Sequence, residues 1–269
     1  MHQTTYLPES TYTIDPSIDY RKLESLYIHN SSVSGIVTRL DQNKKLLEVS
    51  INENLTAKMN FSDATIYPIY NDNGELSPNV YRLVGKKIRA KITDFYTNDI
   101  FLSRKENMLE ALKHIKTKTI FNSARIVGFS RMCAFIDVGE GIIGKSYGKD
   151  FSFVIYKDIH DLGLKIGDII PVKVIEFFEN DNRFELSRVD VLPSHYDYFT
   201  PGDVLTCKVF GNVENDPHQE GYFVLIDSTF CGIVDSPNVK LDYGDLIIAT
   251  VKKLKDDGLK LNFLEKLNF

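Results

Sequence analysis

Residues 128–188 constrain the fold more than any other part of this chain. Apolar and polar residues alternate there in short runs, such as 133–138 and 169–176, and glycines stand at the ends of these runs. Alternation with a period of two is typical of a half-buried strand, and glycine between such runs marks turns and sharp bends. The segment therefore predicts a small, strongly bent antiparallel barrel.

Weaker copies of this pattern lie on both sides of the segment. The first copy opens near 33–39 and closes with Leu-Ser-Arg at 102–104, which matches the Leu-Ser-Arg ending at 186–188. The third copy opens at 201–209 and closes at 259–263. One alternating segment with glycines fits many barrels, whereas three copies in the same order are much less expected by chance. We therefore expect three tandem barrels.

The order and spacing of these motifs resemble the S-one family of RNA-binding OB-folds, named after a ribosomal protein. The resemblance is strongest in the middle copy and covers most of residues 30–265. It implies a mainly β chain of three tandem five-stranded OB-fold barrels with a short connecting helix. The helical period of residues 105–115 predicts that this helix packs between the first two barrels. The expected domains are an N-terminal arm at 1–25, a first barrel with the connecting helix at 26–118, a second barrel at 119–192 and a divergent third barrel at 193–269.

The N-terminal arm offers little pattern of its own. Asp15-Pro16-Ser17 is expected to cap a short helix that reaches Leu26. The favoured interpretation is a tail without a role of its own.

Charge is distributed unevenly along a chain whose net charge is −5. Residues 26–118 carry 14 Lys and Arg against 10 Asp and Glu, a net of +4. Residues 196–269 carry 7 against 12, a net of −5. The first barrel is therefore the expected phosphate-facing one, and the acidic last third is expected to be a solvated face or a surface that meets a protein.

Several classes of function find no support in the sequence. There is no apolar run of membrane-spanning length and no basic-then-apolar secretory signal, so we expect a cytoplasmic protein without a membrane partner. The three cysteines are far apart and suit reduced thiols. The histidines are scattered, and the group Asp158, His160 and Asp161 is a remote metal-site candidate. We therefore expect no enzyme activity, no cofactor and no metal.

The resemblance implies a binding site on the outer face of the second barrel. OB barrels bind single strands across their second and third strands, where rings stack on bases and cations hold phosphates. Phe135 matches the family phenylalanine, Tyr147 stands at the family histidine position, and Met132 replaces the first aromatic. The alternative is that Phe135 belongs to the core and Tyr147 to its rim. The cations expected to complete this site are Arg131, Lys145 and Arg183.

The outer barrels differ from the second at these positions. The first barrel has Glu48 and Asn60 in place of stacking residues, so binding there would be electrostatic, with a solvated basic surface as the alternative. The third barrel keeps Phe223 but has Asp235 at the histidine position, which favours packing or protein binding. The first-barrel residues expected to contact RNA are Lys86, Lys87, Arg89 and Arg104.

The sequence thus predicts a non-catalytic, single-stranded RNA-binding protein that acts in translation or RNA metabolism. The acidic third barrel would contact the ribosome or another nucleoprotein machine. The main alternative is a protein-interaction adaptor, associated with a ribosome, polymerase or replication assembly, whose barrels have largely lost nucleic-acid binding. Single-stranded DNA is a third option, because an OB face distinguishes RNA only by contacts to the 2′-hydroxyl.

Overall fold

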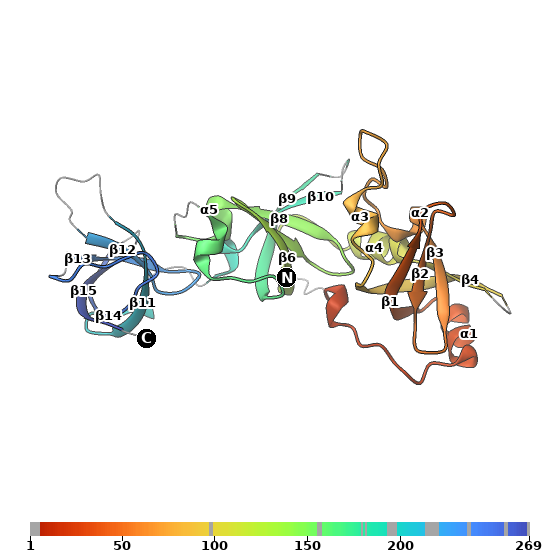
Figure 1. Ribbon diagram of the computed structural model, residues 1–269, viewed down its shortest axis with the longest axis horizontal. Coiled ribbons are helices and arrows are strands. Elements are labelled where there is room, and N and C mark those ends of the chain that lie inside the picture. The colour runs from red at the N-terminus through yellow and green to blue at the C-terminus, as the bar shows by residue number, and fades with distance from the viewer. Residues whose placement is uncertain are drawn as a thin grey trace. The chain divides into compact units, whose positions relative to one another are not determined.

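The computed structural model confirms a mainly β chain of three closed five-stranded barrels with OB-fold topology (Figure 1). It describes residues 6–96, 99–154, 158–178, 180, 182–192, 198–212, 221–235, 238–255 and 258–267. By their contacts these residues form two units, and the second barrel is divided between them. The first unit comprises 1–125, 136–144 and 174–185, and the second comprises 126–135, 145–173 and 186–269.

The first barrel shows how the strands close. Its order is β1-β2-β3-β5-β4, in which β1 pairs with both β2 and β4 and β3 runs parallel to β5. Residues 32–36 of β1 pair with β4 and residues 36–41 pair with β2, and a bulge between Val37 and Arg39 bends the strand. Alternate residues of each strand face a core that contains Val37, Val49 and Leu102. The strands are β1 (Ser32–Asp41), β2 (Leu46–Ser50), β3 (Thr56–Asn60), β4 (Lys87–Phe95) and β5 (Ile100–Ser103).

The second and third barrels repeat this cyclic order of strands. In the third barrel, β11 carries a bulge between Val209 and Gly211, at the place of the β1 bulge. The second barrel consists of β6 (Ile120–Ser130), β7 (Cys133–Asp137), β8 (Ile143–Tyr147), β9 (Ile169–Phe178) and β10 (Arg183–Ser187). The third consists of β11 (Val204–Asn212), β12 (Gly221–Leu225), β13 (Cys231–Asp235), β14 (Leu246–Lys255) and β15 (Gly258–Lys266).

Short helices cover and connect the strands. The helix expected at 105–115 is α4 (Arg104–Leu112), which begins where Ser103 accepts a hydrogen bond from the Glu106 amide at 3.2 Å. Met108 and Ala111 of this helix are buried, and α4 packs against β4 of the first barrel. None of the helices within the described residues is long and apolar enough to cross a membrane. The other helices are η1 (Glu9–Thr11), α1 (Tyr20–Ile28), α2 (Phe61–Ala64), α3 (Pro78–Tyr81), α5 (Gly148–Phe151), η2 (Ile159–Leu162) and η4 (Val189–Val191).

The described part of the N-terminal arm is not a tail without a role. Ile18 and Leu23 belong to the core cluster of the first barrel, and Leu23 is fully buried. The expected cap at 15–17 is also wrong, because α1 begins after Asp19, whose carboxylate accepts from the Lys22 amide at 2.8 Å. The Asp15 carboxylate instead accepts a hydrogen bond from the Ser17 amide, which closes a local turn. The arm therefore contributes apolar residues to the fold of the first unit.

Candidate nucleic-acid interface

Phe135 lies on β7 against a glycine of the neighbouring strand. A Cβ atom at Gly128 would stand 3.7 Å from Cδ2 of Phe135, an ordinary van der Waals contact, so the ring packs over this glycine. Phe135 is half-buried, whereas its strand neighbours Ala134 and Ile136 are fully buried. Because successive side chains of a strand point to opposite faces, the Phe135 ring belongs to the outer face of the barrel.

Lys145 and Tyr147 share that face on the adjacent strand β8. The Lys145 ammonium lies 5.6 Å from the centroid of the Phe135 ring, within the range of a cation–π contact. Tyr147 is two residues further along the same strand and is 41% exposed. The structure thus brings together an aromatic ring, a cation and an exposed tyrosine, as the sequence predicted for this face.

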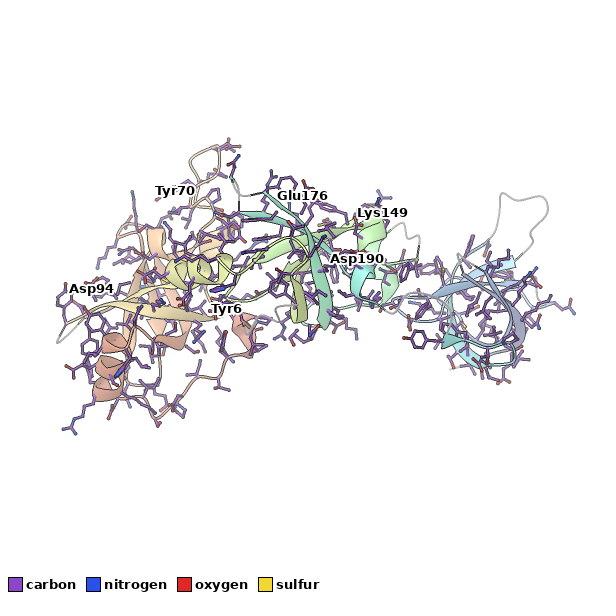
Figure 2. All side chains as sticks on the ribbon, turned by 180° about the vertical axis from the view of Figure 1, so that it is seen from behind. Tyr6, Tyr70, Asp94, Lys149, Glu176 and Asp190 are labelled. Carbon is purple, nitrogen blue, oxygen red and sulfur yellow. The ribbon has the colours of Figure 1, made fainter. Side chains whose placement is uncertain are left out.

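Met132 and Arg131 lie at the β6–β7 turn beside this face. The Met132 carbonyl accepts from the Gly148 amide at 3.3 Å, which places the turn next to the residue that follows Tyr147. The Met132 side chain is exposed. Arg131 is also exposed, and its carbonyl accepts from the Ile159 amide at 3.0 Å. Lys149 is an exposed residue of the short helix α5 (Figure 2). The turn and α5 therefore add cations near Tyr147.

Arg183 belongs to the other unit of the chain. It is an exposed residue of β10, and its guanidinium carbon lies 5.6 Å from the centroid of the Phe178 ring. That contact places it on the β9–β10 hairpin. Whether Arg183 joins Phe135 in one site stays a prediction.

The prediction that Arg104 contacts RNA does not fit the structure. Arg104 is only 5% exposed, and its Nε and Nη2 donate to the two carboxylate oxygens of Glu9 at 2.7 and 2.9 Å. Its Nη1 donates to the Ala64 carbonyl at 2.8 Å. A guanidinium bound in this way cannot reach a phosphate at the surface, so Arg104 drops out of the residues expected to contact RNA.

The other first-barrel cations that were expected to bind RNA differ in their exposure to solvent and in their contacts. Arg89 is half-buried and forms an ion pair with Glu140 at 2.7 Å, while its guanidinium carbon lies 4.6 Å from the Tyr12 ring centroid. Lys87 is half-buried and its ammonium donates to the Ser10 carbonyl at 3.4 Å. Lys86 is exposed. Of the residues expected to bind RNA here, Lys86 is the most available.

Ion pairs engage several of the cations that the first barrel carries. Three pairs have short contacts, and each joins a strand residue to an acid on another element or strand. Exposed pairs of this kind contribute little stability, but they reduce the field that a phosphate chain would meet. The pairs are Arg39 with Glu48 at 3.7 Å, Lys58 with Asp99 at 2.5 Å and Lys91 with Glu110 at 2.7 Å.

In the third barrel, as in the second, a phenylalanine ring packs over a glycine of the neighbouring strand. Gly211 is paired with Phe223, and a Cβ atom at Gly211 would stand 3.8 Å from Cδ2 of that ring. The Phe210 ring lies nearby, with 6.0 Å between centroids. Phe223 is half-buried, and Val224 beside it in the strand is fully buried. The signal that sequence reasoning missed is the glycine near the end of the first strand, which the second and third barrels share and the first replaces with Arg39.

Asp235 does not leave an unbalanced negative charge on this face. Lys252 and Lys260 contact its carboxylate at 2.8 and 3.0 Å. Burial would raise the pKa of Asp235, but the hydrogen bonds and charges of the two lysines outweigh it and lower that pKa. The three residues carry a net positive charge, so Asp235 by itself does not argue against phosphate binding on this face.

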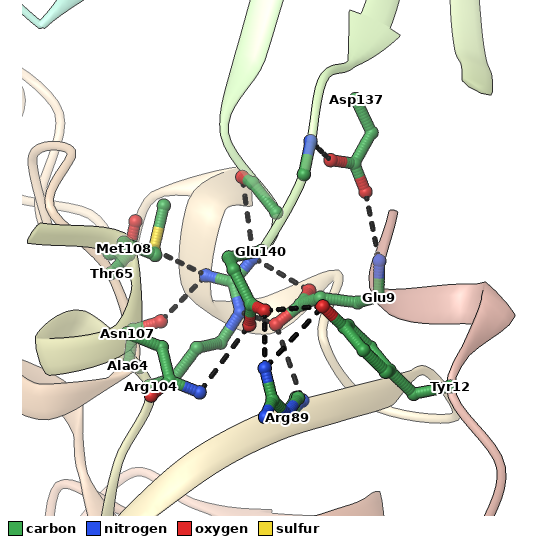
Figure 3. A network of polar contacts seen from close by, with 12 residues as sticks. Glu9, Tyr12, Ala64, Thr65, Arg89, Arg104, Asn107, Met108, Asp137 and Glu140 are labelled. Atoms are coloured by element: carbon green, nitrogen blue, oxygen red, sulfur yellow. Dashed lines mark hydrogen bonds and ion pairs between the residues drawn. The ribbon is translucent and has the colours of Figure 1, made fainter. Parts of the chain in front are cut away.

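A buried polar network fastens residues 6–12 to the β7–β8 loop within the first unit (Figure 3). The Glu140 carboxylate, 1% exposed, accepts from Tyr12 Oη at 2.5 Å and Arg89 Nη1 at 2.7 Å, and Asn107 donates to it at 3.4 Å. The Glu140 amide in turn donates to the Leu7 carbonyl at 3.0 Å. The Asn107 contact confirms that α4 meets a loop of the second barrel.

Asp137 adds a titratable group to this network. Its carboxylate accepts from the Gly139 amide at 2.9 Å and from the Glu9 amide at 3.4 Å. Burial, reinforced by the negative charge of Glu9, raises the pKa of Asp137 to about 7, against the opposing effect of Arg104. Because Glu9, Arg104, Asp137 and Glu140 are all buried and bind one another or their neighbours, the network holds this part of the fold together.

Asp158 and His160 do not build a metal site with Asp161. His160 Nδ1 lies 2.6 Å from Asp158 Oδ1, while Asp161 accepts from the Tyr243 hydroxyl at 2.5 Å. Across the part of the chain that the structure describes, no group of three or more His, Cys, Asp or Glu residues could hold a metal ion. His195 and His218 lie outside the described residues.

Comparisons with known proteins do not assign this chain to a family. No protein-family model matches the chain, and no curated protein matches it. Similar solved structures include an a/eIF2alpha–aDim2p–rRNA complex from Pyrococcus horikoshii OT3, with 20% identity over 28% of this chain and 46% of that chain, at a TM-score of 0.25. This chain therefore matches less than half of that protein's length.

Two further solved structures are similar at comparable levels. A multidomain protein with nucleic acid binding domains from Streptococcus pneumoniae TIGR4 shares 14% identity over 88% of this chain and 74% of that chain, at a TM-score of 0.25. GSP13 from Bacillus subtilis shares 22% identity over 32% of this chain and 66% of that chain, at a TM-score of 0.27. These TM-scores are too low to assign a function, which has to come from the residues of this chain.

Proposed function

We propose that this chain is a non-catalytic protein that binds single-stranded RNA across the outer face of its second barrel. The observation that supports this most is the group formed by Phe135, Lys145 and Tyr147. A ring backed by Gly128, a cation 5.6 Å from that ring and an exposed tyrosine on the same strand face supply what a nucleotide needs.

Each part of this group has a physical role toward a nucleotide. A base stacked on an aromatic ring contributes about 1–3 kcal/mol, and stacking tolerates any base because every base has a π-face. The Lys145 ammonium can neutralise a phosphate while it stays near the Phe135 ring. Arg131 and Lys149 add positive charge beside Tyr147. The expected binding is therefore of moderate affinity, weakly sequence-dependent and sensitive to salt.

The third barrel extends this proposal. Phe223 against Gly211, with the Phe210 ring and the excess positive charge of the Asp235 cluster, makes a second face of similar chemistry. The first barrel contributes less, because Arg104 is buried against Glu9 and Arg89 is paired with Glu140. We further propose a role in translation or RNA metabolism in the cytoplasm, as the resemblance to the S-one family implies.

A second candidate function has an observation in its favour. The ion pairs on the first barrel and the net charge of −5 suit a protein-interaction adaptor, because they weaken attraction to a phosphate backbone. In that case the barrels bind a protein subunit of a ribosome, polymerase or replication assembly in place of nucleic acid.

Binding of the purified chain to labelled single-stranded RNA and DNA oligonucleotides, at low and at physiological salt, tests the proposal. Micromolar or tighter RNA binding that weakens as salt rises supports it, and the DNA arm shows whether the 2′-hydroxyl matters. Absence of binding even at low salt would overturn the RNA proposal and leave the adaptor as the candidate.

A further inference from the structure

The Leu-Ser-Arg ending of the first two barrels places each arginine in the same kind of contact. Arg104 follows β5 and donates through Nη2 to the Gly141 carbonyl in the β7–β8 loop at 3.4 Å. Arg188 follows β10 and donates through Nη1 to the Ser228 carbonyl in the β12–β13 loop at 3.0 Å. Both arginines are 5% exposed. In each case the arginine that ends one barrel meets the loop between the second and third strands of the next.

The contact made by Arg188 is the more extensive of the two toward the following loop. Its Nη2 donates to the hydroxyls of Ser228 and Thr229 at 2.9 and 3.1 Å, and its Nη1 also reaches the Phe151 carbonyl at 3.4 Å. The Ser152 hydroxyl donates to the same Ser228 carbonyl at 3.2 Å. The end of α5 and the β12–β13 loop therefore meet around one guanidinium.

The chemistry of this contact favours a defined geometry. Within the described residues, no carboxylate lies at ion-pair distance from Arg188, and its hydrogen bonds go to neutral oxygens. Burial lowers the pKa of Arg188, and the charge of Asp227 opposes that effect from a longer distance. The guanidinium presents its donors in a rigid planar fork, which a lysine could not reproduce. Several oxygen acceptors have to match the donors of the Arg188 guanidinium at the same time. This requirement defines one position of the β12–β13 loop relative to α5.

A second hydrogen bond lies apart from Arg188 in the same unit. The Tyr243 hydroxyl, in the segment before β14, donates to Asp161 of η2 at 2.5 Å. Two separate points of contact restrict rotation more than one does. The second-barrel segments that carry Phe135 and Tyr147 and the third barrel that carries Phe223 belong to this unit.

We propose that Arg188 is a positioning residue that holds the second and third barrels in one arrangement, so that one RNA strand contacts both aromatic faces. The RNA part of this inference rests on the proposed function. When an RNA strand is bound to the Phe135 face, a fixed arrangement keeps the Phe223 face close to the same strand. The effective concentration of the Phe223 face is then high, which increases the affinity for long strands without any new contact. Short strands that occupy one face gain nothing from the arrangement.

The first test measures, without RNA, how firmly the contact around Arg188 holds the second and third barrels together; we call this contact the joint. Spin labels at Ile166→Cys and Val239→Cys, both exposed positions of this unit, report the distance between the two barrels in a Cys231→Ser background. We expect a narrow distance distribution that broadens in Arg188→Gln. Equal widths in the two proteins would overturn the proposed joint. Should Arg188→Gln fail to fold, Thr229→Val removes one acceptor while it keeps the side-chain shape, and the same broadening is expected to a smaller extent.

The second test measures affinity against RNA length in the full chain. Arg188→Gln is expected to weaken binding of a strand of about 25 nucleotides by roughly tenfold or more, and to leave a strand of about 5 nucleotides unchanged. Lys240→Gln, which removes an exposed charge elsewhere on the third barrel, is the matched control and should change neither.

The outcomes separate the two proposals. Equal losses on short and long strands, or a wild-type protein that gains no affinity with length, would overturn the positioning role. A wild-type protein that binds no RNA would overturn the proposed function, while the distance measurement would still decide whether Arg188 forms the joint.

Discussion

The carboxylate of Glu9 and the guanidinium of Arg104 form a two-point ion pair although 95 residues separate them in the chain. Glu9 is 6% exposed and Arg104 5%. A buried pair is expensive to desolvate, so its members depend on each other more than an exposed pair does. The pair also explains why residues 6–12 are ordered, since one of their side chains balances the charge at the start of α4 (Figure 3).

Removal of the Glu9 carboxylate is therefore expected to loosen the network. Glu9→Ala leaves the Arg104 charge buried without its acid, and breaking a buried pair costs about 3–5 kcal/mol. The Glu140 amide reports this, because it donates to the Leu7 carbonyl of the same segment. Hydrogen exchange at that amide should become markedly faster. Asp15→Asn, which removes an exposed pair with Lys22, is the control and should leave the exchange unchanged.

Gly141 is expected to tolerate no side chain for a reason that goes beyond its backbone angle. Its φ is +72°, and a Cβ atom there would lie 2.7 Å from Glu9 Oε2 and equally close to the Arg104 guanidinium carbon. Gly74 has a similar φ of +77° with nothing within 4 Å. Gly74→Ala should thus cost only the backbone strain, about 1–2 kcal/mol, and Gly141→Ala considerably more. Thermal unfolding of both variants measures the difference, and equal losses would contradict it.

The RNA-binding face can be tested with its two rings. Phe135→Ala together with Tyr147→Ala is expected to weaken RNA binding by about 2–4 kcal/mol if both rings stack on bases. Tyr70→Ala, which removes an exposed ring from the first unit (Figure 2), is the matched control and should bind as the wild type does. Titration of a labelled RNA strand measures the affinities. Unchanged affinity in a folded double variant would place the site elsewhere.

The barrels could be predicted from the sequence because their signals are local. Alternation along β7 and β9, glycines at the strand ends and the two Leu-Ser-Arg endings all depend on neighbours within a few residues. The Phe135 face was expected from the resemblance to the S-one family, and strand periodicity agrees with it, since Lys145 and Tyr147 stand two residues apart on one strand. Strand periodicity alone decides which side chains share a face.

The role of Arg104 could not be predicted in this way. Its partner Glu9 is a lone acid in a segment without periodicity, and no spacing rule links positions so far apart. The pairs of Lys58 with Asp99 and Arg89 with Glu140 are equally non-local. Counting cations in residues 26–118 therefore overstated the charge available to a phosphate chain, because tertiary contacts decide which charges are already matched.

Asp137 predicts a pH dependence of the network that Glu9 and Arg104 share. Burial raises the pKa of Asp137 from its ordinary value of 3.8 to about 7, and the Glu9 charge adds to that effect. Below about pH 4 the folded and unfolded states both hold the proton. Between about pH 4 and pH 7 only the folded state keeps it, so stability falls as pH rises, and the loss is complete once the folded carboxyl ionises above pH 7.

Asp137→Asn is expected to remove this fall, because an amide does not titrate while its oxygen can still accept from the Gly139 amide. The direct measurement is the carboxyl carbon shift of Asp137 by NMR from pH 3 to pH 9, with a midpoint expected near 7. Hydrogen exchange at the Gly139 amide, corrected for its intrinsic pH dependence, should show local opening that becomes easier across the same interval in the wild type and not in the variant. A midpoint near 4 would mean that the carboxylate is better solvated or better paired than its contacts with the Glu9 and Gly139 amides imply.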